Sequence, residues 1–180
     1  LAWGSWHPCG KRALVDVNLF DKFFEEVTGF EPFPWQRRLA RKLVADGWDA
    51  SKPWSEIYGL PTSSGKTSIQ IVWLFALACQ VASGGPRTLP LRLFWTVDRR
   101  VIVDESYELG KRLERALKEA RKGTVTYQVR EALMLLAGDD KYPLEDGVSF
   151  RATRMRGGTF RDPSWMRDPR VPTIVSTTVD

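Results

Sequence analysis

Histidine and cysteine are scarce in this sequence. His7 is the single histidine, and Cys9 and Cys79 are the two cysteines among 180 residues. A structural zinc site needs about four such ligands, so we predict none here. With His7 alone, the chain also lacks the residues for any Ser-His-Asp, Cys-His or HD-type metal mechanism that needs a second histidine. Cys79 lies in an apolar run, where a buried, reduced thiol is usual, so nothing indicates an oxidising compartment.

Long apolar runs are missing too. The longest, Ile71–Cys79, has nine residues, whereas a membrane-spanning helix needs about 20. We therefore expect a cytoplasmic protein without a membrane partner. The chain has 43% hydrophobic and 27% charged residues, as ordinary soluble domains do, which excludes wholesale disorder. Its length suits one domain, but because it begins with Leu1 and residues 173–180 look unfinished, we expect a piece of a longer protein.

Apolar periodicity predicts alternating helices and strands. Helical spacing occurs over 18–27, 35–46, 101–122 and 126–137, and a stretch that is apolar almost all round, 67–82, predicts a helix buried against a sheet. Short runs predict strands at 56–60, 91–97 and 173–177, and a long irregular stretch precedes the last of them. This alternation predicts an α/β fold with a mostly parallel sheet and helices on both faces.

The strongest chemical signal is Pro61-Thr-Ser-Ser-Gly-Lys-Thr67, between a predicted strand and an apolar helix. This is the context of a phosphate-binding loop, in which backbone N–H groups and the positive end of a helix dipole hold phosphate. Lys66 would reach the β- and γ-phosphates of a nucleotide and Thr67 would bind Mg²⁺ through its hydroxyl, so both are the candidate catalytic residues. The remaining candidate nucleotide-binding residues of the loop are Thr62, Ser63, Ser64 and Gly65.

The loop departs from the usual phosphate-binding pattern at two positions. Leu60 stands in place of the first glycine, and Ser63 stands at a second position where glycine is usual. The alternative interpretation is a chance Gly-Lys-Thr whose Ser and Thr side chains only cap a helix.

Gln36 lies thirty residues before Lys66, at the start of a predicted helix. Its amide carries both a donor and an acceptor, which suits the edge of adenine. Taken alone, such a glutamine is usually a solvated surface residue, and the phosphate-binding loop is what favours the adenine hypothesis.

Arginines form two further candidate groups. Arg99 and Arg100 follow a predicted strand, where ligands bind in open α/β sheets, so they are candidates for contacting nucleic acid. The segment Arg151–Arg170 holds six arginines and two aspartates, which accounts for four of the chain's five net positive charges. Arginines interleaved with aromatic rings suit phosphate contact and base stacking, and Arg154 and Arg156 are the candidates here. The alternative for Arg99 and Arg100 is that they are ordinary surface arginines or pair with Asp98, Asp104 or Glu105. The alternative for the segment is that its arginines pair with acidic groups elsewhere in the parent protein.

Taken in order, these elements resemble the first RecA-type lobe of a superfamily 2 helicase. The segment Val97-Asp-Arg-Arg, the Arg-x-Arg-Gly-Gly at 154–158 and the final Thr-Ile-Val-Ser-Thr-Thr-Val-Asp resemble the CRISPR-associated helicase-nuclease of type I systems, especially its I-G branch. By this resemblance Gln36 reads adenine, Lys66 and Thr67 serve ATP and Mg²⁺, and Thr178 opens a Thr-x-Asp-Gln motif that faces DNA.

The resemblance also implies partners and boundaries. Residues 1–33 would be an N-terminal extension with an amphipathic helix, and residues 34–180 a RecA-like P-loop NTPase lobe that is incomplete, cut before its Asp-Glu-x-His box. It implies single-stranded DNA as substrate, a crRNA-guided surveillance complex as partner, and a second lobe and a nuclease domain elsewhere in the full enzyme; the piece alone is expected to be inactive. The alternatives are another superfamily 2 motor of restriction or repair, or a nucleic-acid-binding module without ATPase activity.

Overall fold

A three-stranded, all-parallel sheet organises the chain. The computed structural model describes residues 15–46, 59–61, 63–85, 87–137, 147–157 and 163–179. The strands are β1 (Arg92–Val97), β2 (Arg151–Met155) and β3 (Thr173–Thr178), in the order β1-β3-β2. Trp95 and Arg154 both lie beside Ser176 of the central strand. The predicted α/β class and parallel sheet are confirmed.

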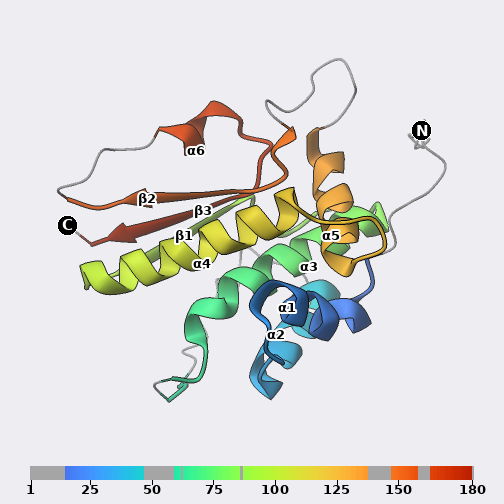
Figure 1. The fold of residues 1–180 in the computed structure, drawn as a ribbon, viewed down its shortest axis with the longest axis horizontal. Helices are drawn as coiled ribbons and strands as arrows, with labels where there is room; N and C mark the ends of the chain where they lie inside the picture. The colour runs from blue at the N-terminus through green and yellow to red at the C-terminus, as the bar shows by residue number, and fades with distance from the viewer. Residues whose placement is uncertain are drawn as a thin grey trace.

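Helices cover both faces of this sheet (Figure 1). The long amphipathic helix α4 (Arg100–Lys118) lies on one face, where the Ser106 and Ser176 hydroxyls are 2.9 Å apart. The single-turn helix α6 (Ser164–Arg167) lies on the other face, where Trp165 packs edge-on against Phe94 with ring centroids 6.0 Å apart. Because the strands are parallel, their carboxyl ends lie together along one side of the sheet, at the left of Figure 1, which we call its carboxyl edge. The start of α4 lies at the same edge.

The remaining helices form a second layer beyond α4 (Figure 1). They are α1 (Phe20–Thr28), α2 (Pro34–Asp46), α3 (Ile69–Ser83) and α5 (Val125–Met134), with 3-10 turns at Val17–Leu19, Lys66–Ser68 and Leu135–Ala137. Helix α1 is tied to α5 by Glu26, whose carboxylate accepts from the N–H groups of Val125 and Thr126 and so caps the first turn of α5.

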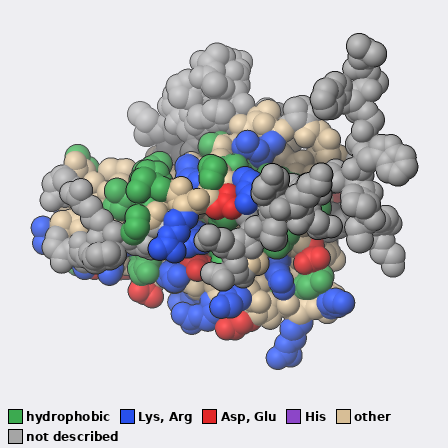
Figure 2. Space-filling view, turned by 90° about the horizontal axis from the view of Figure 1, so that it is seen from above, with side chains coloured by type: hydrophobic (Ala, Val, Ile, Leu, Met, Phe, Trp, Pro, Cys, Tyr) green, Lys and Arg blue, Asp and Glu red, His purple; other side chains and the backbone are tan. Residues whose placement is uncertain are grey.

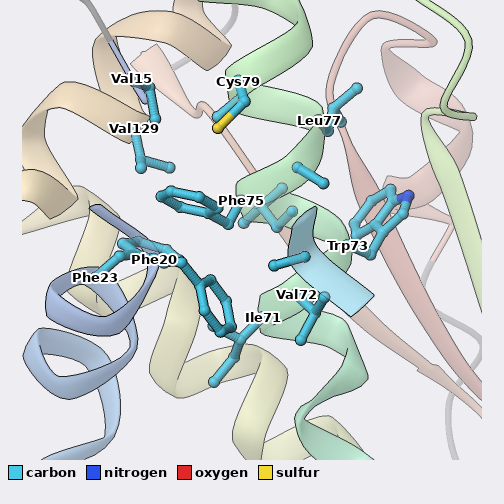
Figure 3. Close-up of a cluster of buried hydrophobic side chains, with 14 of the residues drawn as sticks. Val15, Phe20, Phe23, Ile71, Val72, Trp73, Phe75, Leu77, Cys79 and Val129 are labelled. Carbon is cyan, nitrogen blue, oxygen red and sulfur yellow. The ribbon is translucent and has the colours of Figure 1, made fainter. Parts of the chain in front are cut away.

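Helix α3 is the centre of the hydrophobic core. In Figure 3, Phe75 points toward Phe20 and Phe23, whose ring centroids lie 5.3 Å from its own. The prediction that this segment is buried is confirmed, but its placement directly against a sheet is wrong. The amphipathic helix α4 takes that place, and α3 packs mainly between α2 and α5. A helix that is apolar all round needs cover on several sides, and neighbouring helices supply it.

One stretch, Lys66–Ser83, is long and apolar enough to cross a bilayer by length and composition, although it has no long unbroken apolar run. Two thirds of it, 67%, is buried within the protein. Core helices of soluble proteins pass the same test, so it is weak grounds for a membrane span.

Most predicted element positions are confirmed within a few residues, with two exceptions. Strand β2 lies in the stretch that we predicted to be irregular. The predicted strand at 56–60 lies mostly outside the described residues, and its last two positions, Gly59 and Leu60, have no regular structure. A phosphate-binding loop is expected to follow a strand and precede a helix. The structure therefore describes the loop and the helix of this arrangement but not the strand.

Candidate functional site

Glycine and serine in the left-handed conformation shape the Gly-Lys-Thr loop. Gly65 has a φ of 72° and caps the turn Lys66–Ser68 that leads into α3. Ser63 has a φ of 63° and is the one non-glycine residue with positive φ in the described part of the chain. The loop thus adopts at Ser63 the backbone conformation that glycine favours, although the sequence departs from glycine there.

The start of α2 braces this loop. Trp35 donates from its indole Nε1 to the carbonyl of Ser64 at 2.8 Å, and Gln36 donates from Nε2 to the carbonyl of Gly65 at 3.1 Å. A Cβ on Gly65 would lie 2.9 Å from Nε2 of Gln36 and 3.2 Å from the ring of Phe33. Gly65 is therefore required both by its φ and by the close approach of the helix.

Gln36 is fully buried at this contact. Its Oε1 accepts from the N–H of Phe33 at 2.7 Å, so both ends of the amide bind backbone groups of the protein. The bracing role of Gln36 was not predicted. Its role in reading adenine stays a prediction.

Lys66 is exposed and folds back onto its own loop. Its Nζ donates to the carbonyls of Leu60 at 2.9 Å and Pro61 at 3.3 Å, and the hydroxyl of Ser64 also donates to Pro61, at 2.7 Å. The N–H groups of Lys66 and Thr67 have no backbone acceptor within the described residues. These N–H groups lie at the positive end of a helix dipole, so they can bind an anion by donating hydrogen bonds to it. Thr62 lies outside the described residues.

Replacing Ser63 by glycine is expected to stabilise the protein by about 0.5–1 kcal/mol, because glycine adopts a positive φ without steric cost. Ser68→Gly is the matched control, since Ser68 has a φ of −70°, and there glycine adds only flexibility and should lower stability. Urea unfolding of both variants measures the effect. Equal destabilisation by both would contradict the strained conformation at Ser63.

The second candidate group lies at the carboxyl edge of the sheet. Arg154 donates from Nη1 to Oδ1 of Asp104 at 2.7 Å, and Arg156 donates from Nε to the same oxygen at 3.0 Å. The guanidinium of Arg154 also lies 4.9 Å from the ring centroid of Tyr107. Arg100 reaches the same place, since its Nη2 lies 3.6 Å from where a Cβ on Gly157 would be. We call Arg100, Arg154, Arg156 and Asp104 the edge cluster.

The two other nucleic-acid candidates differ in exposure. Arg99 is exposed just before α4. Thr178, at the end of β3, is buried, and its hydroxyl has no hydrogen-bond partner among the described residues. Both lie at the carboxyl edge of the sheet, so the fold brings Arg99, Thr178 and the edge cluster to one edge.

A buried polar chain joins this part of the fold to the loop helix. In the first turn of α3, Gln70 donates from Nε2 to the carbonyl and the hydroxyl of Ser106, at 3.2 and 2.5 Å. The Ser106 hydroxyl in turn contacts that of Ser176 in β3. All three side chains are fully buried, so buried hydrogen bonds hold the start of α3 to α4 and the central strand, while Oε1 of Gln70 has no hydrogen-bond partner among the described residues.

Arg170, of the basic segment, and Arg92, on β1, have structural partners. Arg170 binds Asp168 at 2.7 Å, and its hydrogen bonds lower the pKa of that carboxyl. Arg92, on β1, donates to the carbonyls of Val171 and Asp168, and its burial lowers the pKa of its guanidinium. The view from above the sheet shows basic side chains in separate groups beside acidic ones (Figure 2). This distribution agrees with arginines that are partly neutralised locally.

Comparison with protein-family models, with curated proteins and with solved structures gives no match for this chain. Within the described residues, no three His, Cys, Asp or Glu side chains come together to hold a metal ion. The site therefore has to be interpreted from its own residues.

Proposed function

We propose that this chain forms the ATP-binding part of a motor that moves on single-stranded DNA, the first RecA-like lobe of a superfamily 2 helicase. The observation that carries the proposal is the Gly-Lys-Thr loop at the start of a buried helix of an α/β protein, where the N–H groups of Lys66 and Thr67 have no backbone acceptor among the described residues. Arginines at the carboxyl edge of a parallel sheet are a second support, because ligands of open α/β folds bind at such edges.

The residues of the loop fit a nucleotide triphosphate with Mg²⁺. The N–H groups of Lys66 and Thr67 would hold phosphate oxygens, and the Thr67 hydroxyl would ligate the metal. Lys66 would exchange the carbonyls of Leu60 and Pro61 for phosphate oxygens. Bound ATP supplies the phosphoryl group whose hydrolysis drives a motor. The sequence contains no Asp-Glu-x-His box, so we expect this chain to bind nucleotide without turnover.

The particular motor that we favour is the type I CRISPR helicase-nuclease of the I-G branch. Its support is the sequence of the Arg-x-Arg-Gly-Gly segment and of residues 173–180. In that setting the chain would work in the cytoplasm, with DNA delivered by a crRNA-guided surveillance complex and with a second lobe and a nuclease domain completing the enzyme. A restriction or repair motor of the same superfamily is the alternative within this class.

A nucleic-acid-binding module without ATPase activity is a second candidate. The observation that favours it is the loop closed by its own lysine, with Leu60 in place of the first glycine. In such a module Lys66 would remain bound to the two carbonyls, and nucleotide would not bind.

Titration with a fluorescent ATP analogue and Mg²⁺ separates the two candidates. Wild-type protein should bind, and Lys66→Ala should bind at least about tenfold more weakly, because it loses a charge-assisted contact worth about 1.5–3 kcal/mol. Lys118→Ala, at the far end of α4, removes the same charge and should leave binding unchanged. Equal affinity of Lys66→Ala and wild type would refute the loop assignment.

A further inference from the structure

One carboxylate oxygen holds two arginines in the edge cluster. Oδ1 of Asp104 accepts both from Arg154, at 2.7 Å, and from Arg156, at 3.0 Å. The two arginines come from β2 and from the residue just after it, whereas Asp104 lies in the first turns of α4. The carboxylate is thus the point where the start of the helix meets the carboxyl end of an edge strand.

This arrangement is not needed to hold the core together. The side chains of Asp104, Arg154 and Arg156 are 37%, 30% and 20% exposed, and ion pairs that reach solvent contribute little to stability. The core below them is closed by other contacts, those of Ser106 and Gly110 with the strands. Asp104 can therefore lose its arginines without unfolding the protein.

The local charge leaves a surplus once Asp104 is removed. Besides Arg154 and Arg156, the nearby basic groups among the described residues are Arg99 and Arg100, and the other carboxylates are those of Asp98, just before α4, and Glu105, in its first turns. Among the described residues, this part of the chain thus carries four arginines and three carboxylates, and of these carboxylates only Asp104 is bound to two of the arginines. A guanidinium pair that converges on one oxygen is also the arrangement that binds a phosphate oxygen.

We propose that Asp104 is an internal competitor for the DNA backbone: its carboxylate takes the place on Arg154 and Arg156 that a phosphate of single-stranded DNA occupies when the strand binds. The inference rests on the proposed function, because it specifies how the DNA site of that motor is regulated. Binding of the strand exchanges one anion for another at the two arginines. The carboxylate weakens the grip on DNA and so permits release, which a translocating protein needs at every step.

Removing the competing charge should strengthen DNA binding in a salt-dependent manner. Asp104→Asn keeps the shape of the side chain but removes the negative charge that both guanidinium groups contact, so at low salt we expect several-fold tighter binding of a fluorescein-labelled oligothymidylate by anisotropy. For a single strand, each further phosphate that is neutralised makes the plot of log affinity against log salt concentration steeper by about 0.7. The ratio of the affinity of Asp104→Asn to that of wild type should therefore fall about 2.5-fold between about 50 and 200 mM salt. Inorganic phosphate, added at constant ionic strength, tests whether a free anion takes the site instead.

Two control variants change the net charge equally. Glu105→Gln removes the neighbouring carboxylate on α4, which has no ion pair with a described residue. Asp21→Asn removes one of the two carboxylates that pair with Arg37, on the distant α1–α2 pair. Both should leave the salt slope unchanged. If either matches Asp104→Asn, the effect is one of net charge and the inference fails.

The remaining outcomes separate this inference from the proposed function. If Arg154→Ala and Arg156→Ala weaken DNA binding but Asp104→Asn does not strengthen it, Asp104 is no competitor while the DNA site stands. If millimolar phosphate displaces the strand from Asp104→Asn and not from wild type, the site takes a free anion once Asp104 is gone, as proposed. If neither wild type nor Asp104→Asn binds single-stranded DNA at low salt, both the inference and the DNA part of the proposed function are overturned.

Discussion

Trp73→Asp should unfold this protein. Trp73 lies in the middle of α3 with 0% of its surface exposed, and its indole Nε1 donates to the carbonyl of Pro90 just before β1. Truncating a buried tryptophan costs about 3–5 kcal/mol, and a buried unpaired carboxylate costs several more. Together these exceed or nearly equal the whole stability of an ordinary domain, about 5–15 kcal/mol.

The buried thiol of Cys79 provides a direct measurement of this unfolding. Burial, together with the charge of Asp16, raises the pKa of Cys79 to about 12, so at neutral pH the folded protein keeps it protonated and inaccessible. In a Cys9→Ser background, a thiol reagent should label Trp73→Asp at once and wild type only in urea. Trp73→Phe, the matched control, should remain folded with a stability lower by about 1–3 kcal/mol. A Trp73→Asp protein that stays protected and melts cooperatively would show that α3 is misplaced.

Gly110→Val should be the second most damaging change. A Cβ at Gly110 of α4 would lie 2.8 Å from the Cβ of Ala152 in β2 and 3.4 Å from Oε1 of Gln70. The Cβ of Ala152 is fixed directly to the backbone of β2, so it cannot give way without moving the strand apart from α4. Overpacking of this kind costs about 1–3 kcal/mol, and the two extra methyl groups of valine should bring the loss to at least about 3 kcal/mol.

Urea denaturation of a graded series tests this close approach. Gly110→Ala should lie between wild type and Gly110→Val, because the gain in helix propensity, up to about 1 kcal/mol, offsets part of the clash. Gly59→Val is the control, since no atom of the described residues lies within 4 Å of its Cβ position, and its stability should stay within about 0.5 kcal/mol of wild type. A Gly110→Ala protein more stable than wild type would mean that the helix can move off the strand.

The elements that sequence analysis predicted well are those whose burial follows from their own residues. Helix α4 has an apolar stripe, and strands β1 and β3 are short apolar runs, so local pattern and tertiary position agree. Strand β2 was missed because its sequence, Arg-Ala-Thr-Arg-Met, is neither apolar nor regularly alternating. It is a strand because it pairs with β3, which buries Ala152 and Thr153, while the arginines of β2 are only partly buried.

The candidate residues were predictable in identity but not in contact. Gly65, Lys66 and Thr67 stand out in sequence through a known spacing, whereas the bracing of the loop by Trp35 and Gln36 depends on how α2 meets α3. Among the alternatives for the arginines, pairing with acidic groups holds for Arg154 and Arg156. Their partner, Asp104, lies about fifty residues away in sequence. No local sequence pattern predicts a contact between residues so far apart, and only the folded structure shows it.

The order of the strands has a kinetic consequence. Within the described sheet, β1 and β2 pair only with β3, and β3 is the last of the three to be synthesised. No strand pair can form on the ribosome until residues 173–178 have left the exit tunnel, however early the helices collapse. The sheet must then close around its final strand by contacts between residues some twenty to eighty positions apart, which is a slow kind of step. Until it does, both outer strands present open edges to other chains, so rapid synthesis should favour aggregation over folding.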